Sequence, residues 1–96
     1  MQVRGWSNGG GTYGLSVGAR NRREFFRPEW DEIQIEIDGA SHAVRITGGF
    51  WNQCPEVRSP VIRDWLRRHR TLEWPKGEPP TAELVPLGDN LFRLVS

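Results

Sequence analysis

The chain has 96 residues, a length that predicts one small domain. Hydrophobic residues make up 36% of it, enough for a modest core, so disorder of the whole chain is not expected. Its only cysteine, Cys54, cannot form an internal disulfide, and no apolar run is long enough to cross a membrane. The first residues lack the apolar segment of a signal peptide, so the sequence predicts a cytoplasmic protein without a membrane partner.

Positive and negative charges almost cancel, with 13 Lys and Arg against 12 Asp and Glu, and this total gives no reason to expect a polyanionic partner. Their distribution is uneven, because residues 1–28 carry five Arg and one Glu, whereas residues 29–48 carry five acids and one Arg. Residues 49–74 carry a second basic block with five Arg. Twelve of the 13 cations are Arg, which suits bidentate recognition of phosphate, although a GC-rich genome produces the same bias.

The predicted elements begin after a Gly-rich start. Residues 1–12 contain four Gly and little apolar content, which predicts a flexible leader, followed by a single barrel-like domain over residues 13–96. A short strand is expected over residues 13–17. The next segment, residues 20–27, holds four Arg around two Phe and is ended by Pro28. It is too short to predict a helix, so residues 20–23 are expected to form a loop between two strands.

The clearest local pattern in the chain predicts a β-hairpin. Three Ile alternate with polar residues over residues 32–38, which is typical of a half-buried strand. Asp38 and Gly39 then provide turn residues that tolerate positive φ, and the alternation resumes over residues 42–47. The β-branched apolar side chains of both strands are expected to be buried together: Ile33, Ile35, Ile37, Val44 and Ile46.

One main helix is predicted over about residues 60–70. Ser59 is a suitable N-cap, and Pro60 suits the first helical position. Trp65 and Leu66 lie on the apolar face of this helix and are expected to pack on the sheet. The opposite face carries three arginines that are expected to face solvent: Arg63, Arg67 and Arg70.

Two strands close the chain, over residues 82–87 and 91–95, and a Gly-Asp-Asn turn joins them. Pro86 lacks a backbone N–H, so it should place the first of these strands at an edge of the sheet. The elements together predict an α+β fold: a small open β-barrel or strongly curved antiparallel sheet with one main helix.

Motifs associated with catalysis or cofactors have little support. Residues 9–14 match G-x-G-x-x-G, but a strand is expected after them in place of the helix that nucleotide binding requires. The three metal-ligating candidates share no ligand spacing: His42, Cys54 and His69. Cys54 and His69 could form a nucleophile pair, but a small buried thiol and a helix-face histidine is the simpler interpretation. We therefore expect no enzymatic activity, no metal and no cofactor.

Two polar segments offer groups that recognise nucleic acids. Residues 20–23 hold three Arg and one Asn, which can read guanine and adenine edges bidentately, and Arg also binds phosphates. Residues 49–53 place an aromatic ring beside two amide side chains. Trp6 and Trp74 are also expected in loops, where their rings either pack or stack on a partner. The candidate nucleic-acid-binding residues are Arg20, Asn21, Arg22, Arg23, Arg27, Trp51, Asn52 and Gln53.

The order of these elements, with the closing segment Gly88-Asp89-Asn90-Leu91-Phe92-Arg93-Leu94, resembles the DNA-binding pseudobarrel superfamily over about residues 13–95. This group includes a class of plant transcription-factor domains and the effector or target-reading domains of some type II restriction enzymes. The resemblance implies an open barrel of about seven strands, capped by short helices, that grips the major groove with two arms built from interstrand loops. Residues 20–23 would lie in the first arm, and residues 49–53 in the second.

The sequence therefore predicts a module without catalytic activity that binds duplex DNA through residues 20–23 and 49–53. If each Arg of the first segment neutralises one phosphate, the three contribute a salt slope of about −3. The alternative is a protein-interaction or oligomerisation module that uses exposed Trp and Arg side chains. Salt distinguishes the two, because phosphate contacts weaken steeply as salt rises and a Trp-centred protein interface does not.

Overall fold

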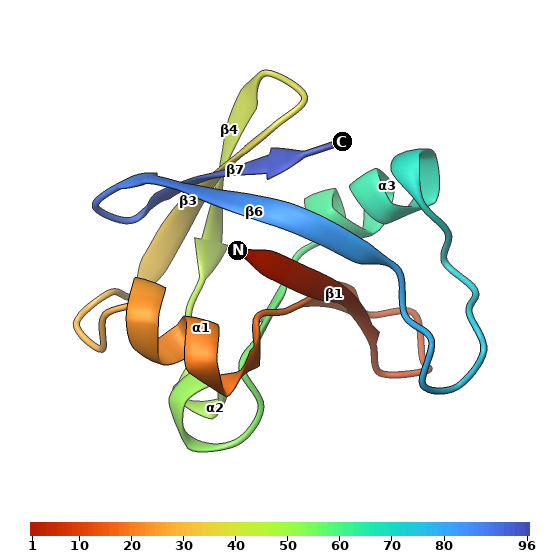
Figure 1. Cartoon of the computed structure of the whole chain (residues 1–96), viewed down its shortest axis with the longest axis horizontal. Coiled ribbons are helices and arrows are strands. Elements are labelled where there is room, and N and C mark those ends of the chain that lie inside the picture. Colours follow the sequence, from red (N-terminus) through yellow and green to blue (C-terminus); the bar gives the residue numbers. More distant parts are fainter.

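Seven strands and three helices build the molecule, and the computed structural model describes all residues from 1 to 96 (Figure 1). The strands are β1 (Gln2–Ser7), β2 (Tyr13–Ser16), β3 (Glu32–Ile37), β4 (Ala40–Arg45), β5 (Glu56–Arg58), β6 (Thr81–Gly88) and β7 (Leu91–Val95). The helices are α1 (Gly18–Phe25), α2 (Gly48–Asn52) and α3 (Pro60–His69).

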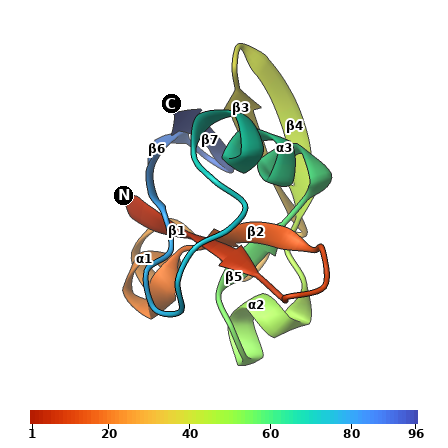
Figure 2. The same ribbon diagram turned by 90° about the vertical axis from the view of Figure 1, so that its right-hand side faces the viewer.

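All seven strands belong to one sheet that curls into a nearly closed barrel. The strand order is β4-β3-β7-β6-β1-β2-β5, and every neighbouring pair is antiparallel except β3 and β7, which are parallel. The outermost strands, β4 and β5, approach each other, so the two edges of the sheet come together. The predicted α+β fold with a small open barrel and one main helix is confirmed. Figure 2 shows α1 and α2 on one side of the β1–β2–β5 section and α3 on the other.

The prediction of a flexible leader is wrong, because β1 lies inside the sheet between β2 and β6. Val3 is 1% exposed, and the amide of Gly5 donates to the carbonyl of Pro80 at 2.8 Å. The N-terminal amino group donates to the carbonyl of Leu84, also at 2.8 Å. This strand is stabilised by pairing with segments far along the chain, a type of contact that local composition does not reveal. Only residues 8–12 form a turn at the surface.

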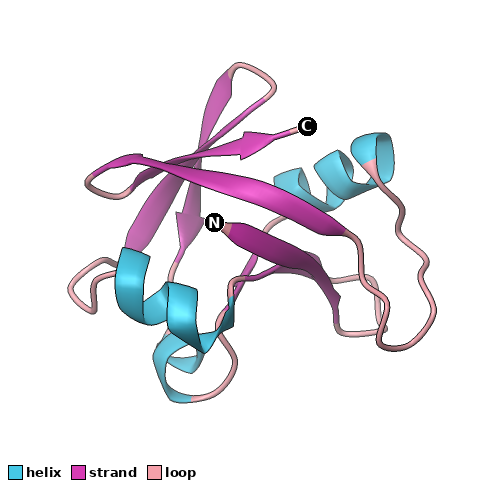
Figure 3. Ribbon diagram, in the orientation of Figure 1, coloured by secondary structure: helices cyan, strands magenta, loops and turns pink.

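Residues 20–23 and 49–53 are not extended loops, because most of them lie in α1 and α2 (Figure 3). Gly18 opens α1 with φ of 83°, a value that glycine adopts without a steric penalty. Helix α1 buries no residue and has no side-chain cap, so its own sequence carries little helical signal. Its stability comes from side-chain hydrogen bonds to distant backbone groups, described below.

The β3–β4 hairpin forms as predicted. Asp38 and Gly39 form its turn with φ of 50° and 84°, which matches the positive φ angles of a type I′ turn. The apolar side chains of β3 and β4 lie in the core with at most 3% exposure: Ile33, Ile35, Ile37 and Val44. Ile46 lies just beyond β4 and is partly buried against the same core.

Helix α3 also agrees with the prediction. The hydroxyl of Ser59 accepts a hydrogen bond from the amide of Val61 at 3.2 Å, and Pro60 takes the first helical position. Trp65 and Leu66 are buried, and α3 packs against β2. The three arginines of the opposite face are exposed: Arg63, Arg67 and Arg70.

The strands at the C-terminal end form the predicted hairpin, but the expected edge position of β6 is wrong. Strand β6 pairs with β7 on one side and with β1 on the other. Strand β6 pairs with β1 only through residues 81–83, so Pro86 lies beyond that pairing. On the other side of β6, Pro86 stands at a register shift in the pairing with β7. A proline is tolerated there because no neighbouring strand requires its missing N–H.

An aromatic cluster fixes α1 and α2 to one end of the barrel. The ring of Phe26 lies 5.0 Å from that of Phe50 and 5.0 Å from that of Phe92, measured between centroids. Phe26 follows α1, Phe50 belongs to α2 and Phe92 to β7, and each is at most 5% exposed. These contacts place the two helices next to each other on a rigid base.

Candidate nucleic-acid interface

The structure brings the two predicted binding segments together through Arg22. Its Nη1 donates to the carbonyl of Phe50 at 2.8 Å and to the carbonyl of Trp51 at 3.3 Å. Its guanidinium carbon lies 5.8 Å from the centroid of the Trp51 ring. Helices α1 and α2 are therefore held side by side, and the polar residues of both helices share one end of the barrel.

Two of the predicted binding residues donate hydrogen bonds to backbone carbonyls inside the protein. Asn21 donates from Nδ2 to the carbonyls of Gln2 and Val17, at 3.1 and 3.0 Å. Arg22 is half-buried and bonds α2 as described above. Both side chains position α1, because Asn21 joins it to β1 and Arg22 satisfies carbonyls that the short helix α2 leaves open.

Trp51 packs within the fold. Its ring meets that of Phe50 edge-on, at 5.3 Å between centroids, and its indole nitrogen is buried without a hydrogen-bond partner. The ring is half-buried. A base stacking on Trp51 would therefore have only part of the ring available.

The remaining predicted residues are exposed on the two neighbouring segments, and we refer to them together as the α1–α2 surface: Arg20, Arg23, Arg27, Asn52 and Gln53. Arg20 pairs through Nε with Glu24 at 3.3 Å, and both side chains are at least 50% exposed, so this ion pair is weak. Arg23 and Arg27 line a hollow of about 370 Å³ that Glu24 and Asp89 also line. The positive charge at this end of α1 is thus partly balanced by carboxylates.

Arg4 extends the positive charge from α1 onto the sheet. It lies on the outer side of β1, opposite Ser16 of β2, and lines a hollow of about 340 Å³ that Arg20 lines from α1. The sequence prediction missed Arg4 because it assigned the first twelve residues to a leader. The alternation of buried Val3 and Gly5 with exposed Gln2 and Arg4 is the signal that identifies it.

Arg58 lies on the same outer side of the sheet, on β5. Register places it opposite Gly14, which in turn lies opposite Trp6 of β1. Because Gly14 has no side chain, the Arg58 guanidinium reaches across it to lie 4.5 Å from the centroid of the Trp6 ring. It also bonds Glu56, whose side chain is only 4% exposed, at 2.9 Å. We call the outward residues of this section the three-strand face: Arg4, Trp6, Ser16 and Arg58.

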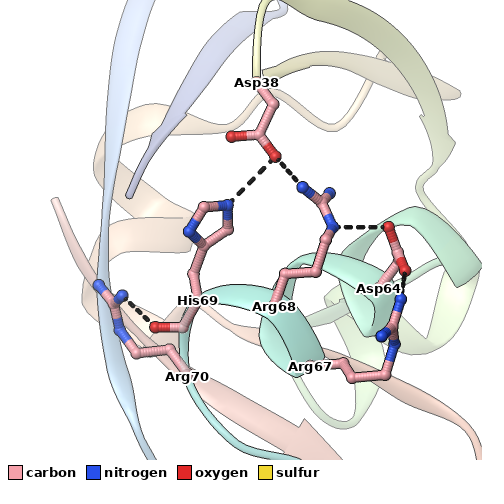
Figure 4. A network of polar contacts seen from close by, with 6 residues as sticks. All are labelled: Asp38, Asp64, Arg67, Arg68, His69 and Arg70. Carbon is pink, nitrogen blue, oxygen red and sulfur yellow. Dashed lines mark hydrogen bonds and ion pairs between the residues drawn. The ribbon is translucent and has the colours of Figure 1, made fainter.

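Two arginines at the C-terminal end of α3, Arg67 and Arg68, are paired with carboxylates (Figure 4). Asp38 at the β3–β4 turn accepts from Arg68 Nη1 at 2.6 Å and lies 3.2 Å from His69 Nε2. Hydrogen bonds from Arg68 and then from His69 lower the pKa of Asp38, and the bond to Asp38 raises the pKa of Arg68. Asp64 binds both Arg67 and Arg68. This network joins the hairpin to α3, whereas the exposed Arg70 bonds only the carbonyls of Thr81 and His69.

The other chemical candidates remain apart. Cys54 is exposed in the connection between α2 and β5, so the expectation of a buried thiol is wrong. His69 bonds Asp38, and no hydrogen bond joins it to Cys54. No group of three or more His, Cys, Asp or Glu lies close enough to hold a metal ion. The helices are all too short to span a membrane.

Trp74 packs against Tyr13 at 6.1 Å between centroids, and Trp6 lies beneath Arg58, so both rings contribute to packing. A comparison of the chain with protein-family models, with curated proteins and with solved structures finds no match, and function is therefore inferred from this chain's own side chains.

Proposed function

We propose that this domain binds duplex DNA through the α1–α2 surface and the adjoining three-strand face. The observation that carries the proposal is the Arg22 bridge, which holds α2 next to α1 at 2.8 Å. The bridge brings the helix that carries Arg20 and Arg23 next to the segment that carries Asn52 and Gln53, and all four side chains are exposed. Arginines bind backbone phosphates, and amide side chains read base edges, so this combination suits a duplex.

The positive charge continues along the barrel, which suits a rod-shaped polyanion. Arg4 and Arg20 line one hollow, and Arg58 lies in the next row of the same outer face. The acidic outer side of β3 lies elsewhere, because β7 and β6 separate β3 from β1 in the sheet. Glu36 of β3 is also paired with Arg93, at 3.0 Å. Repulsion between the carboxylates of β3 and phosphates is therefore kept away from the proposed interface, where Glu24 is paired with Arg20 and the buried Glu56 with Arg58.

We further propose that the chain belongs to the DNA-binding pseudobarrel superfamily that its sequence resembles. A seven-stranded, nearly closed barrel with short helices is the architecture that this resemblance implies. The alternative, a protein-interaction module built on exposed Trp rings, has less support. Each of the five Trp side chains is at least partly buried, so none offers the exposed anchor that such an interface requires.

The test is titration of a labelled DNA duplex at several salt concentrations. The binding variant is Arg20→Ala with Arg23→Ala, which keeps Arg22 and with it the position of α2. The control is Arg67→Ala with Arg93→Ala, which removes two exposed arginines that are paired with carboxylates outside the proposed interface. Each phosphate contact contributes about 0.9 to the salt slope, so the binding variant should flatten it by about 1.8 and the control should not.

Two results would reject the proposal. One is absence of duplex binding by the wild-type domain at low salt. The other is equal affinity and equal salt slope for the wild type and the Arg20→Ala, Arg23→Ala variant, because the α1–α2 surface would then not contact phosphates.

A further inference from the structure

Arg58, on the three-strand face, is held from two sides by other residues of the protein. Its Nη2 donates to Oε1 of Glu56 at 2.9 Å, and its guanidinium carbon lies 4.5 Å from the centroid of the Trp6 ring. The side chain of Glu56 is only 4% exposed, so its carboxylate is fixed by the fold, whereas the side chain of Arg58 is 56% exposed. The guanidinium is therefore ordered and at the same time open to a ligand.

The register of three strands produces this arrangement. Glu56 and Arg58 are two residues apart on β5, so their side chains leave the strand on the same side. Gly14 of β2 lies between Arg58 and Trp6, and a Cβ at that position would overlap the carbonyl oxygen of Val57. The absent side chain leaves the guanidinium room to reach the Trp6 ring.

The three-strand face adjoins helix α1, so a duplex on the α1–α2 surface would also meet this face. Arg4 lies in the row of residues next to that of Trp6 and Arg58, and it lines one hollow together with Arg20 of α1. No acidic residue lines that hollow, so Arg4 offers its charge to a phosphate. Arg58 differs from Arg4, because the carboxylate of Glu56 already balances its charge.

The donors that Arg58 keeps match a base better than a phosphate. A guanidinium has five N–H donors in one plane, and the bond to Glu56 uses one of them. Charge neutralisation contributes less to binding when the cation is already paired, but hydrogen bonds to neutral acceptors remain available. In the major groove, only guanine presents two acceptors side by side, O6 and N7, which a planar guanidinium binds bidentately.

We propose that Arg58 reads a guanine base in the major groove of the bound duplex, and that Glu56 and Trp6 are its positioning residues. The inference rests on the proposed function and deepens it, since it assigns a base preference to the three-strand face. A guanidinium whose plane is fixed before binding loses less side-chain entropy on contact and tolerates fewer alternative bases.

The test is selection of duplexes from a pool with a randomised central segment, followed by titration of the selected duplex at several salt concentrations. The test variant is Glu56→Gln with Arg58→Gln, which removes both charges of the pair, because Arg58→Ala alone would leave a buried carboxylate without its partner. The control is Arg4→Gln on the same face. Thermal unfolding of each variant checks that its fold is intact.

The two variants should have opposite effects. The wild type should select a guanine that the test variant does not, and replacing this guanine by adenine should weaken wild-type binding by a factor of about 5 to 150. The test variant keeps the net charge and should keep the salt slope. Arg4→Gln should still select the guanine but flatten the slope by about 0.9. In the wild type alone, 7-deazaguanine at the selected position lacks the N7 acceptor and should weaken binding.

The outcomes separate this inference from the proposed function. The guanine contact is wrong if the wild type selects no guanine, if the test variant selects the same one, or if 7-deazaguanine leaves wild-type affinity unchanged. The proposed function stands in each of these cases, provided that Arg20→Ala with Arg23→Ala flattens the salt slope. Absence of wild-type binding to any duplex at low salt rejects the proposed function and this inference with it.

Discussion

Arg22→Ala should destabilise the domain, although Arg22 lies in the most strongly basic segment of the chain. The substitution removes a hydrogen bond of 2.8 Å from a charged donor to the carbonyl of Phe50, which contributes about 1.5 to 3 kcal/mol. The bond of 3.3 Å to Trp51 is longer and adds less, and the guanidinium above the Trp51 ring adds about 0.5 kcal/mol. The expected loss is about 2 to 3 kcal/mol, which for a domain of this length lowers the melting temperature by roughly 10 to 20 °C.

The assay is urea unfolding followed by tryptophan fluorescence, with Arg23→Ala as the control. Arg23 is the next residue of α1, is exposed and makes no hydrogen bond within the protein, so its replacement should change stability by less than about 0.5 kcal/mol. If the free energies of unfolding of both variants lie within about 0.5 kcal/mol of the wild-type value, Arg22 does not hold α2 in place. The explanation for the adjacent positions of α1 and α2 then fails.

Three further substitutions test the fold. Gly14→Ala should lower the free energy of unfolding by about 3 kcal/mol or more in chemical denaturation, because its Cβ would overlap the carbonyl oxygen of Val57 in β5; the control Gly48→Ala, whose Cβ would have no neighbour nearer than 4.0 Å, should be tolerated. Ile35→Ala should cost about 2 to 4 kcal/mol, and a smaller loss would contradict its complete burial. Asp38→Asn should lower the melting temperature at pH 7. The pKa of Asp38 is lowered, chiefly by the hydrogen bond from Arg68. The stability that this carboxylate adds to the wild-type protein is therefore complete at pH values above its ordinary pKa of 3.8, and it is lost as the pH falls through the lowered pKa. The two proteins should therefore converge in acid, and a constant difference down to pH 2 would refute this role.

The parts of the fold that the sequence predicted are those with a long and regular pattern. The β3–β4 hairpin combines alternating Ile residues with an Asp-Gly turn, and α3 combines a cap, a proline and a repeated apolar face. Strand β1 has one large buried side chain, Val3, and is stabilised by pairing with β6 about 80 residues away. Helix α1 buries no residue, and its anchors are hydrogen bonds to Gln2 and to α2. Such long-range contacts leave no periodic signal in a single sequence.

The residue types of the candidate site could be predicted from the sequence, but their arrangement in space could not. The sequence shows that residues 20–23 are rich in Arg and that residues 49–53 carry two amides, and both segments do lie at one end of the barrel. It does not show which arginine is free, because the partner of Arg22 is 28 positions away in the chain. On α3, Arg63 and Arg67 are four residues apart and lie on the same face of the helix, yet only Arg67 has a carboxylate partner. The availability of each guanidinium depends on tertiary contacts.

The division between positioning and phosphate-contacting arginines leads to a last prediction, which rests on the proposed function. Arg22 donates to α2, so Arg22→Ala should lower duplex affinity by displacing Asn52 and Gln53 but leave the salt slope unchanged, since no phosphate contact is lost. Arg20→Ala with Arg23→Ala should instead flatten the slope by about 1.8 and leave stability nearly unchanged. Titration at four or more salt concentrations, together with urea unfolding of the same samples, measures both quantities. A slope that flattens by about 0.9 in Arg22→Ala would show that its guanidinium also binds a phosphate and would contradict the assignment of Arg22 to positioning alone.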